Sequence, residues 1–501
     1  MRRALATLTM VFALALPAHA ERPRPLGWAM DAMRAGSWDN AALIARRDGA
    51  VAVDVIEWHR LRAGRGTYAE VTDFLRRRPD WPGEAYLRRQ SEEAVIREGD
   101  KAILDFFTGQ GPQTPEGVLA HAAALLRADR LGEAQARLVL AWRTLPMSGN
   151  DQAKFIDAHG SLLKQHHAAR LDEMLWQREH AEARQMFDLV SDADKALAET
   201  RIALQNLDGD VNALIDALPA SKAGDPGLQA DRFEWRIRKG YGDSAKDLML
   251  SQSVSAAALG QPAAWANRRR ALARDEMRNG DPARAYQMAS KHFLSEGSHF
   301  ADLEWLSGYI ALRFLKDPKL ALGHFQAHDG AVESPISQGR AGYWQGRAYQ
   351  AMGDAEGAAK AYAQGAKFQS SFYGLLAAER GNLPFDTSLA GARPEQDWRT
   401  SALAQAPLFQ AGLLLQASGE LSTAERFWTH LAEQLITEDA ALLGQAAIDV
   451  GQPHLAVMIG KRVAQRGITI AGPYYALHDA IKLDLNMAPE MVLAIARRES
   501  E

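Results

Sequence analysis

Three aspartates at near-equal spacing mark a helical repeat, which is the feature that most constrains this fold. Asp281, Asp317 and Asp354 each follow a helix stop and precede a new stretch with helical apolar periodicity, and they lie 36 and 37 residues apart. Aspartate is a favoured N-cap, and Pro282 and Pro318 occupy the first helical position after two of them. This period is typical of tetratricopeptide-like hairpins. Such hairpins cannot bury their apolar faces alone and therefore stack into a superhelix.

Small residues recur in the register that two packed helices need. The pattern Gly-x-x-Tyr, Gly, Ala-x-x-x-Tyr of residues 346–362 returns in similar form over 412–428 and more weakly over 444–456. These positions place small residues where the two helices of a hairpin touch. Alternating β-branched runs are almost absent, and the nearest candidate, residues 51–56, sits in helical surroundings. We therefore predict an all-α fold built as an α-superhelical solenoid.

Composition excludes several classes of protein. The 501 residues are 47% hydrophobic and 24% charged, which is ordinary globular composition and not that of a disordered or collagen-like chain. A formal charge of −4 gives no electrostatic case for binding nucleic acid. Because the chain has no cysteine, disulfides, thiolate metal sites and a lipoprotein anchor are excluded.

The first twenty residues have the three regions of a secretory signal peptide. Arg2 and Arg3 form the positive region, residues 4–16 the apolar region, and residues 18–20 (Ala-His-Ala) the cleavage motif. The apolar region is too short to span a bilayer, and no later stretch approaches about 18 apolar residues. We expect a periplasmic protein that begins at Glu21 after cleavage and has no transmembrane segment.

Two seams divide the remaining chain. Residues 381–394 are rich in Gly, Pro and Asn and read as a linker between a large solenoid and a smaller helical domain. Residues 467–473 form a second seam before the last helical stretch. The chain stops at Glu501 in mid-helix without a cap, which a natural domain rarely does. We interpret the sequence as cut.

Histidines and tryptophans offer no specific chemistry at these spacings. Metal ligation needs a third ligand on the same face and an open position, and histidines on a solenoid are commonly solvated or hydrogen-bonded, so we predict neither a metal nor a cofactor. The histidine groups are His324 and His328 beside Asp329, and His159, His166 and His167. Tryptophans at helical spacing could line a sugar groove but more often form hairpin core. They include Trp81, Trp176, Trp235, Trp305 and Trp344.

Four stretches of the chain resemble the soluble lytic murein transglycosylases, in the order and spacing of that family. They are Phe-Leu-Arg-Arg-Arg-Pro-Asp-Trp-Pro-Gly at 74–83 followed by Leu-Arg-Arg at 87–89, Tyr-Trp-Gln-Gly-Arg-Ala at 343–348, Ser-Phe-Tyr-Gly-Leu-Leu-Ala at 371–377, and Val-Leu-Ala-Ile-Ala-Arg-Arg-Glu-Ser at 492–500. The last is similar to the helix that carries the family's catalytic Glu-Ser pair. The resemblance extends along nearly the whole chain.

The resemblance implies a periplasmic enzyme of cell-wall turnover that cleaves the β-1,4 bond between MurNAc and GlcNAc in peptidoglycan and forms 1,6-anhydroMurNAc. By that likeness, residues 21–384 form an α-superhelical U-shaped domain, 385–478 a helical linker domain that closes a ring, and 479–501 the start of a lysozyme-like domain. In the family this last domain continues well past the Glu-Ser pair, so we expect the 501-residue chain to be inactive as it stands. The implied partners are glycan strands, with other cell-wall enzymes as further candidates, and a monomer is expected.

Glu499 is the single site residue that the resemblance carries over, as the catalytic acid and base. On a helix, Met491, Ile495 and Glu499 fall at i, i+4 and i+8, so the carboxyl extends an apolar stripe while Arg497 points elsewhere. Burial on such a stripe raises a carboxyl pKa, as a general acid near neutral pH requires. In the 501-residue chain, we expect this carboxyl to lie solvated at a frayed helix end.

A second interpretation is a periplasmic helical scaffold that binds partners through its concave face, without catalysis. The Ala-Arg-Arg-Glu-Ser stretch at 496–500 favours the enzyme, because a scaffold has no need of it. The nucleotide sequence that follows codon 501 distinguishes the two.

Overall fold

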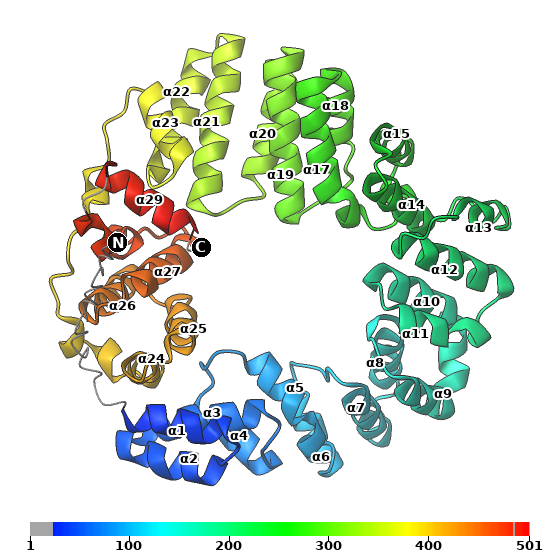
Figure 1. Ribbon diagram of the computed structural model, residues 1–501, viewed down its shortest axis with the longest axis horizontal. Helices are drawn as coiled ribbons and strands as arrows, with labels where there is room; N and C mark the ends of the chain where they lie inside the picture. The colour runs from blue at the N-terminus through cyan, green and yellow to red at the C-terminus, as the bar shows by residue number, and fades with distance from the viewer. Residues whose placement is uncertain (1–23, 484–485, 500–501) are drawn as a thin grey trace, which may run out of the picture.

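The helices of this protein follow one another around a closed ring with a central opening (Figure 1). The computed structural model describes residues 24–483 and 486–499. Within these ranges all regular elements are α-helices or short 3-10 and π turns, and there are no strands. Residues 51–56, the stretch of the sequence most similar to a strand, lie inside helix α3 (Ala50–Arg62), in keeping with their helical surroundings. The predicted signal peptide, residues 1–20, lies outside the described residues. The all-α superhelical fold is confirmed.

The ring is traced by helices of four to eighteen residues. The first arc comprises α1 (Pro25–Arg34), α2 (Trp38–Ala45), α3 (Ala50–Arg62), α4 (Tyr68–Arg77), α5 (Glu84–Val95), α6 (Asp100–Phe106), α7 (Pro115–Arg127), α8 (Leu131–Thr144), α9 (Gly149–Leu163), α10 (His167–Gln177) and α11 (His180–Gln185). The second comprises α12 (Asp192–Gln205), α13 (Asn212–Asp216), α14 (Pro226–Arg238), α15 (Gly242–Gln252), α16 (Ala256–Leu259), α17 (Pro262–Asn279), α18 (Pro282–Ser290), α19 (Gly297–Ile310), α20 (Pro318–Asp329), α21 (Pro335–Met352), α22 (Ala355–Gly365) and α23 (Phe372–Arg380). The third comprises α24 (Pro407–Ala417), α25 (Leu421–Ala432), α26 (Thr437–Asp449), α27 (Pro453–Ala464), α28 (Ala471–Tyr474) and α29 (Pro489–Glu499).

The three aspartates of the sequence repeat are N-caps, as predicted. Asp281, Asp317 and Asp354 precede α18, α20 and α22, and each side chain accepts a hydrogen bond of 2.8 or 2.9 Å from a backbone N–H of the first turn. Each cap satisfies a donor that the helix itself leaves unpaired. These three helices are the second members of successive hairpins, so the 36- and 37-residue period of the sequence is the period of the solenoid.

Glycines allow the hairpin helices to pack closely at two of the predicted positions. A Cβ on Gly346 would lie 2.5 Å from the ring of Tyr362, and one on Gly412 would lie 2.2 Å from the ring of Trp428. Gly444 differs from the prediction, because its contact is Pro473 of α28 and not the partner helix α27. The short helix α28 wedges against α26 at this point, which the pattern of small residues alone does not show.

The ring closes where the first helices meet α24 and α25. The ring of Phe427 in α25 lies 5.1 Å from that of Trp58 and 5.0 Å from that of Trp81, with both pairs near perpendicular. These three side chains belong to one hydrophobic core shared by the N-terminal helices and residues 398–470. On the surface of the same junction, Arg34 donates to Glu420 at 2.8 Å. The closure is therefore a packed core and not a loose contact.

The chain leaves the solenoid at α23 and enters the last group of helices at α24. Between them lie only three 3-10 turns among the described residues: η6 (Thr387–Ala390), η7 (Trp398–Thr400) and η8 (Ala402–Gln405). The Gly/Pro/Asn-rich composition of residues 381–394 predicted this interruption. The domain boundaries at 384/385 and 478/479 stay predictions.

Candidate functional site

Helix α29 carries Glu499 and is the last described element of the chain. It begins with Pro489, places Glu490 in its first turn, and places Arg497 and Arg498 in its last turn. This order suits a helix, because proline fits the first position and the charges complement the helix dipole. Figure 1 shows α29 beside α27, with its C-terminal end toward the centre of the ring.

Arg497 holds α29 on the ring. Its Nη1 donates to the backbone carbonyl of Tyr474 at 2.9 Å. Its guanidinium also lies 4.2 Å from the ring centroid of Tyr474 and 5.3 Å from that of Tyr475, within cation–π distance of both. Tyr475 in turn donates from its hydroxyl to the carbonyl of Ser370 at 3.1 Å. The helix is thus tied through α28 to the end of the solenoid.

An apolar groove of about 490 Å³ lies between α27, α28 and α29. Its walls combine the two tyrosines with aliphatic side chains from both helices. The lining residues are Pro453, His454, Val457, Met458, Tyr474, Tyr475, Ala476, Leu477, His478, Glu490, Leu493, Ala494, Ala496 and Arg497. Burial raises the pKa of the Tyr475 hydroxyl, so this group stays protonated at neutral pH.

Glu499 lies on the face of α29 that points away from this groove. Met491 and Ile495 of the same stripe are 54% and 47% exposed, and Glu499 is exposed as well. The structure therefore places the three side chains as the helical spacing predicts and leaves the stripe open to solvent. Arg497 points the other way, into the groove, as expected. The catalytic role of Glu499 stays a prediction.

Three solved structures with a similar fold are of lytic transglycosylases. The 70-kDa soluble lytic transglycosylase of Escherichia coli aligns with a TM-score of 0.59 at 18% identity, over 95% of this chain and 76% of that chain. The lytic transglycosylase Slt of Pseudomonas aeruginosa, solved as an inactive mutant, aligns with a TM-score of 0.64 at 17% identity, over 96% of this chain and 78% of that chain. This chain has the soluble lytic transglycosylase fold.

A third structure of this fold is a complex of the 70-kDa soluble lytic transglycosylase with bulgecin A. It aligns with a TM-score of 0.58 at 17% identity, over 95% of this chain and 76% of that chain. A scan against models of protein families finds no match, and a search of curated protein sequences finds none either. At these identities the likeness is one of fold, and activity has to be argued from residues.

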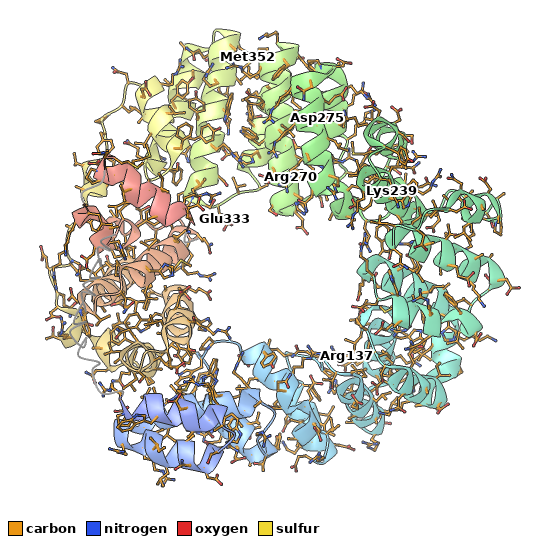
Figure 2. The ribbon with its side chains drawn as sticks, in the orientation of Figure 1. Arg137, Lys239, Arg270, Asp275, Glu333 and Met352 are labelled. Carbon is orange, nitrogen blue, oxygen red and sulfur yellow. The ribbon has the colours of Figure 1, made fainter. Side chains whose placement is uncertain are left out.

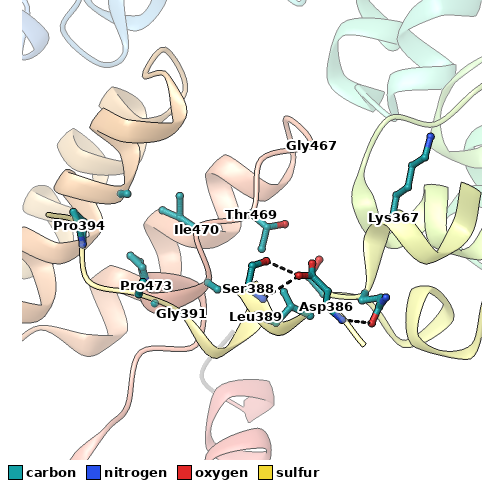
Figure 3. Close-up of a pocket in the computed structure, with 16 residues that line it drawn as sticks. Lys367, Asp386, Ser388, Leu389, Gly391, Pro394, Gly467, Thr469, Ile470 and Pro473 are labelled. Atoms are coloured by element: carbon teal, nitrogen blue, oxygen red, sulfur yellow. Dashed lines mark hydrogen bonds between the residues drawn. The ribbon is translucent and has the colours of Figure 1, made fainter. Parts of the chain in front are cut away.

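A second hollow in the lytic transglycosylase fold lies at the junction between the solenoid and the last helices (Figure 3). It has a volume of about 310 Å³ and lies between Lys367 on one side, the turn around Asp386 and Ser388, and residues 467–473, which lead into α28. Ser388 donates to Asp386 at 2.6 Å, and this pair fixes the turn. The sequence marks both seams that meet here, 381–394 and 467–473, but gives no signal that they touch.

Two of the histidines singled out in the sequence, His324 and His328, make hydrogen bonds within the solenoid. His292 and His324 hydrogen-bond the two carboxylate oxygens of Glu304 at 2.9 and 2.7 Å. Although burial raises the pKa of Glu304, these two hydrogen bonds outweigh it and lower that pKa to about 2. His328 donates from Nδ1 to the carbonyl of Ala301 at 2.8 Å. Over the described ranges, no cluster of three or more suitable side chains is placed to hold a metal ion.

The tryptophans divide between core and partly exposed positions. Trp81 and Trp344 are buried, as predicted for hairpin core. Trp176, Trp235 and Trp305 are half-buried, and Trp305 lies under the guanidinium of Arg340.

In the part of the chain that the structure describes, no helix is long and apolar enough to span a membrane.

Proposed function

We propose that this chain is the ring and the first catalytic helix of a peptidoglycan lytic transglycosylase that acts in cell-wall turnover. The observation that carries the proposal is the fold match over 95–96% of the chain. The sequence of 492–500, similar to the family's catalytic helix, supports it independently, because residues 492–499 lie on the helix that Arg497 ties to the ring. A shared fold does not by itself imply a shared activity, so the proposal rests on both observations.

The proposed reaction needs one carboxyl group. Glu499 protonates the oxygen of the glycosidic bond between MurNAc C1 and GlcNAc O4, and that bond breaks with GlcNAc leaving as the alcohol. The resulting carboxylate takes the proton from the muramic 6-hydroxyl as its oxygen bonds to C1. The product is 1,6-anhydroMurNAc, and Glu499 regains its proton. Water is not consumed, so the second carboxylate of a hydrolytic glycosidase is not required.

One of the structures with a similar fold also has a glutamate linked to activity. The Pseudomonas protein is described as an inactive mutant with one glutamate changed to glutamine. For this chain, the support is the position of Glu499 at the exposed end of α29, next to Met491 and Ile495 on an open apolar stripe. Such a stripe is suited to being covered by further protein, and a carboxyl covered in this way gains the raised pKa of a general acid.

We propose the domain arrangement that the resemblance implies. Residues 1–20 direct export to the periplasm, 21–384 form the U-shaped superhelix, 385–478 the linker domain, and 479–501 the start of the lysozyme-like domain. Its substrate is the glycan strand of peptidoglycan, and it works as a monomer without a cofactor. Because the family's catalytic domain continues past its Glu-Ser pair, the 501-residue chain alone releases no product.

The proposal is tested by changing Glu499 in a protein extended by the reading frame that follows codon 501. Purified sacculi are digested and anhydromuropeptides are counted by mass spectrometry. We expect Glu499→Gln to lower release by about 100-fold or more, the usual effect of losing a general acid. Glu490→Gln, on the first turn of the same helix, is the matched control and leaves release within about twofold of the parent.

Two outcomes contradict the proposal. Near-normal release by Glu499→Gln means that another residue is the acid, and release by the 501-residue chain itself means that no further domain is needed. A natural stop codon after 501 followed by unrelated sequence favours the scaffold instead.

A further inference from the structure

Arginines from two hairpins of the solenoid lie near one carboxylate on the hairpin between them. Arg270, Arg274 and Arg278 lie at i, i+4 and i+8 on α17, so they share one helix face. Arg340 comes from α21, and the carboxylate is Asp302 on α19 between them. These three helices are the first members of their hairpins, and Figure 2 shows Arg270 closer to the central opening than Asp275 of the same helix.

Asp302 is held from both sides by two of these arginines. Arg270 donates from Nη1 to Oδ2, and Arg340 donates from Nη2 to Oδ1 at 3.4 Å. One carboxylate is thus shared by two guanidinium groups. Elsewhere in the solenoid one arginine pairs with one acid, as Arg268 does with Glu234.

Arg274 differs from Arg270 and Arg340 in having no acidic partner among the described residues. Within the described residues it makes no hydrogen bond or ion pair, although a guanidinium carries five N–H donors. Its side chain is half-buried. Burial and the neighbouring charge of Arg270 lower the pKa of Arg274, while Asp302 opposes that shift. A partly desolvated, unpaired charge costs free energy that a bound anion recovers.

Arg340 is positioned by an aromatic surface. Its guanidinium lies 5.0 Å from the ring centroid of Trp305, which packs edge-on against Trp344 at 6.1 Å. Its Nε is buried without a hydrogen-bond partner among the described residues, and its one bond to Asp302 is long. The planar head is therefore held in place by stacking while most of its donors stay available.

We propose that Arg270, Arg274 and Arg340 form a binding site for a carboxylate-bearing ligand, distinct from the helix that carries Glu499. The planar guanidinium of arginine can bind a carboxylate through two hydrogen bonds. Arg270 and Arg340 already hold the carboxylate of Asp302 between them, so their separation suits such a group. Resting on the proposed function, the ligand is the peptide attached to muramic acid in peptidoglycan, which carries free carboxylates. The ring then binds the peptides, and α29 contacts the glycan strand.

The site is tested by isothermal titration of the full chain with a purified disaccharide-tetrapeptide from peptidoglycan. We expect Arg274→Gln to raise the Kd by about tenfold, because charge-assisted hydrogen bonds are lost. Arg274 has no partner to lose among the described residues, so the fold is expected to be unchanged. Arg143→Gln, an exposed arginine on α8, removes the same charge elsewhere and leaves the Kd unchanged.

Asp302→Asn is expected to strengthen peptide binding, a result that misfolding of the variant would not produce. Removing the internal carboxylate frees Arg270 and Arg340, so we expect the Kd for the disaccharide-tetrapeptide to fall by about fivefold. The same peptide with its carboxylates converted to amides is expected to bind at least tenfold more weakly than the acid form.

Three results overturn the site. They are an unchanged Kd in both Arg274→Gln and Asp302→Asn, equal binding of the amidated peptide, or displacement of the peptide by inorganic phosphate at equal concentration, which would make it a phosphate site. These results leave the proposed function standing, because product release is measured separately. Conversely, if peptide binding depends on Arg274 but the protein extended past codon 501 releases no anhydromuropeptides, only the catalytic proposal is refuted.

Discussion

The Nε2 atom of His430 lies 3.1 Å from the backbone carbonyl oxygen of Asp80, across 350 residues of sequence. Because a carbonyl oxygen only accepts hydrogen bonds, His430 donates from Nε2. Next to this bond, Trp81 packs edge-on against Phe427. The motif at 74–83, one of the four stretches that resemble the family, therefore closes the ring against α25.

Phe427 is the centre of that closure and is fully buried. We expect Phe427→Ala to lower the free energy of unfolding by about 3–5 kcal/mol, because the change leaves a cavity between the two ends of the ring. Phe385→Ala, at a position 62% exposed, is the control and changes stability by less than about 0.5 kcal/mol. Urea denaturation followed by circular dichroism measures both. Equal effects of the two changes would show that the aromatic contact does not hold the ring.

His59 makes the same region sensitive to acid. Burial, followed by the charges of Arg62, Arg34 and Arg426, lowers the pKa of His59 from 6.5 to about 4. As the pH falls from 6.5 toward 4, the unfolded chain binds a proton that the folded chain does not, so stability falls across this window. We expect His59→Gln to make the free energy of unfolding less dependent on pH there. His478→Gln, at an exposed position, keeps the parental slope; identical slopes in all three proteins refute the prediction.

Gly346 and Gly323 are both helical glycines with opposite surroundings. A Cβ at Gly346 meets the ring of Tyr362 at 2.5 Å, whereas one at Gly323 meets nothing within 4 Å. We expect Gly346→Ala to destabilise the protein by about 1–3 kcal/mol through overpacking. Gly323→Ala should stabilise it by about 0.5–1 kcal/mol, because alanine loses less backbone entropy in a helix. Thermal melts of the two variants give the signs, and a loss at both positions contradicts the second half.

Arg497 fixes the helix that carries Glu499. Replacing it with alanine removes the hydrogen bond to the Tyr474 carbonyl and the cation–π contact. Together these contribute about 1–2 kcal/mol, so amides of α29 should exchange about tenfold faster in Arg497→Ala. Arg498→Ala, on the exposed side of the same turn, is the matched control. Hydrogen exchange measured by mass spectrometry compares the two variants. Unchanged protection of α29 in Arg497→Ala would mean that other contacts hold this helix.

The local parts of this fold were predictable from the sequence. Helix caps such as Asp317 and close approaches such as Gly412 against Trp428 involve residues within about twenty positions of each other. Their physics is local: a cap needs one side chain and one turn, and a hairpin needs one small residue opposite one large one. The same holds for the stripe of Met491, Ile495 and Glu499, which helical periodicity alone defines.

Contacts between distant segments were not predictable in this way. Nothing in the sequence shows that Gly444 meets Pro473, that the seams at 381–394 and 467–473 enclose one hollow, or that Asp302 lies between Arg270 and Arg340. Each of these depends on the angle between successive hairpins, which accumulates along the solenoid.

The sequence by itself determined that this chain is a helical solenoid whose last helix presents a glutamate at its end, because periodicity, capping and small-residue spacing act within one or two turns of the chain. Only the tertiary structure decided that the solenoid bends into a ring closed by Trp58, Trp81 and Phe427. It also decided that Arg270 and Arg340, from separate hairpins, meet at Asp302. The reason is that small rotations between neighbouring hairpins add up over the whole ring, so the position of its two ends is a property of the sum and not of any one repeat.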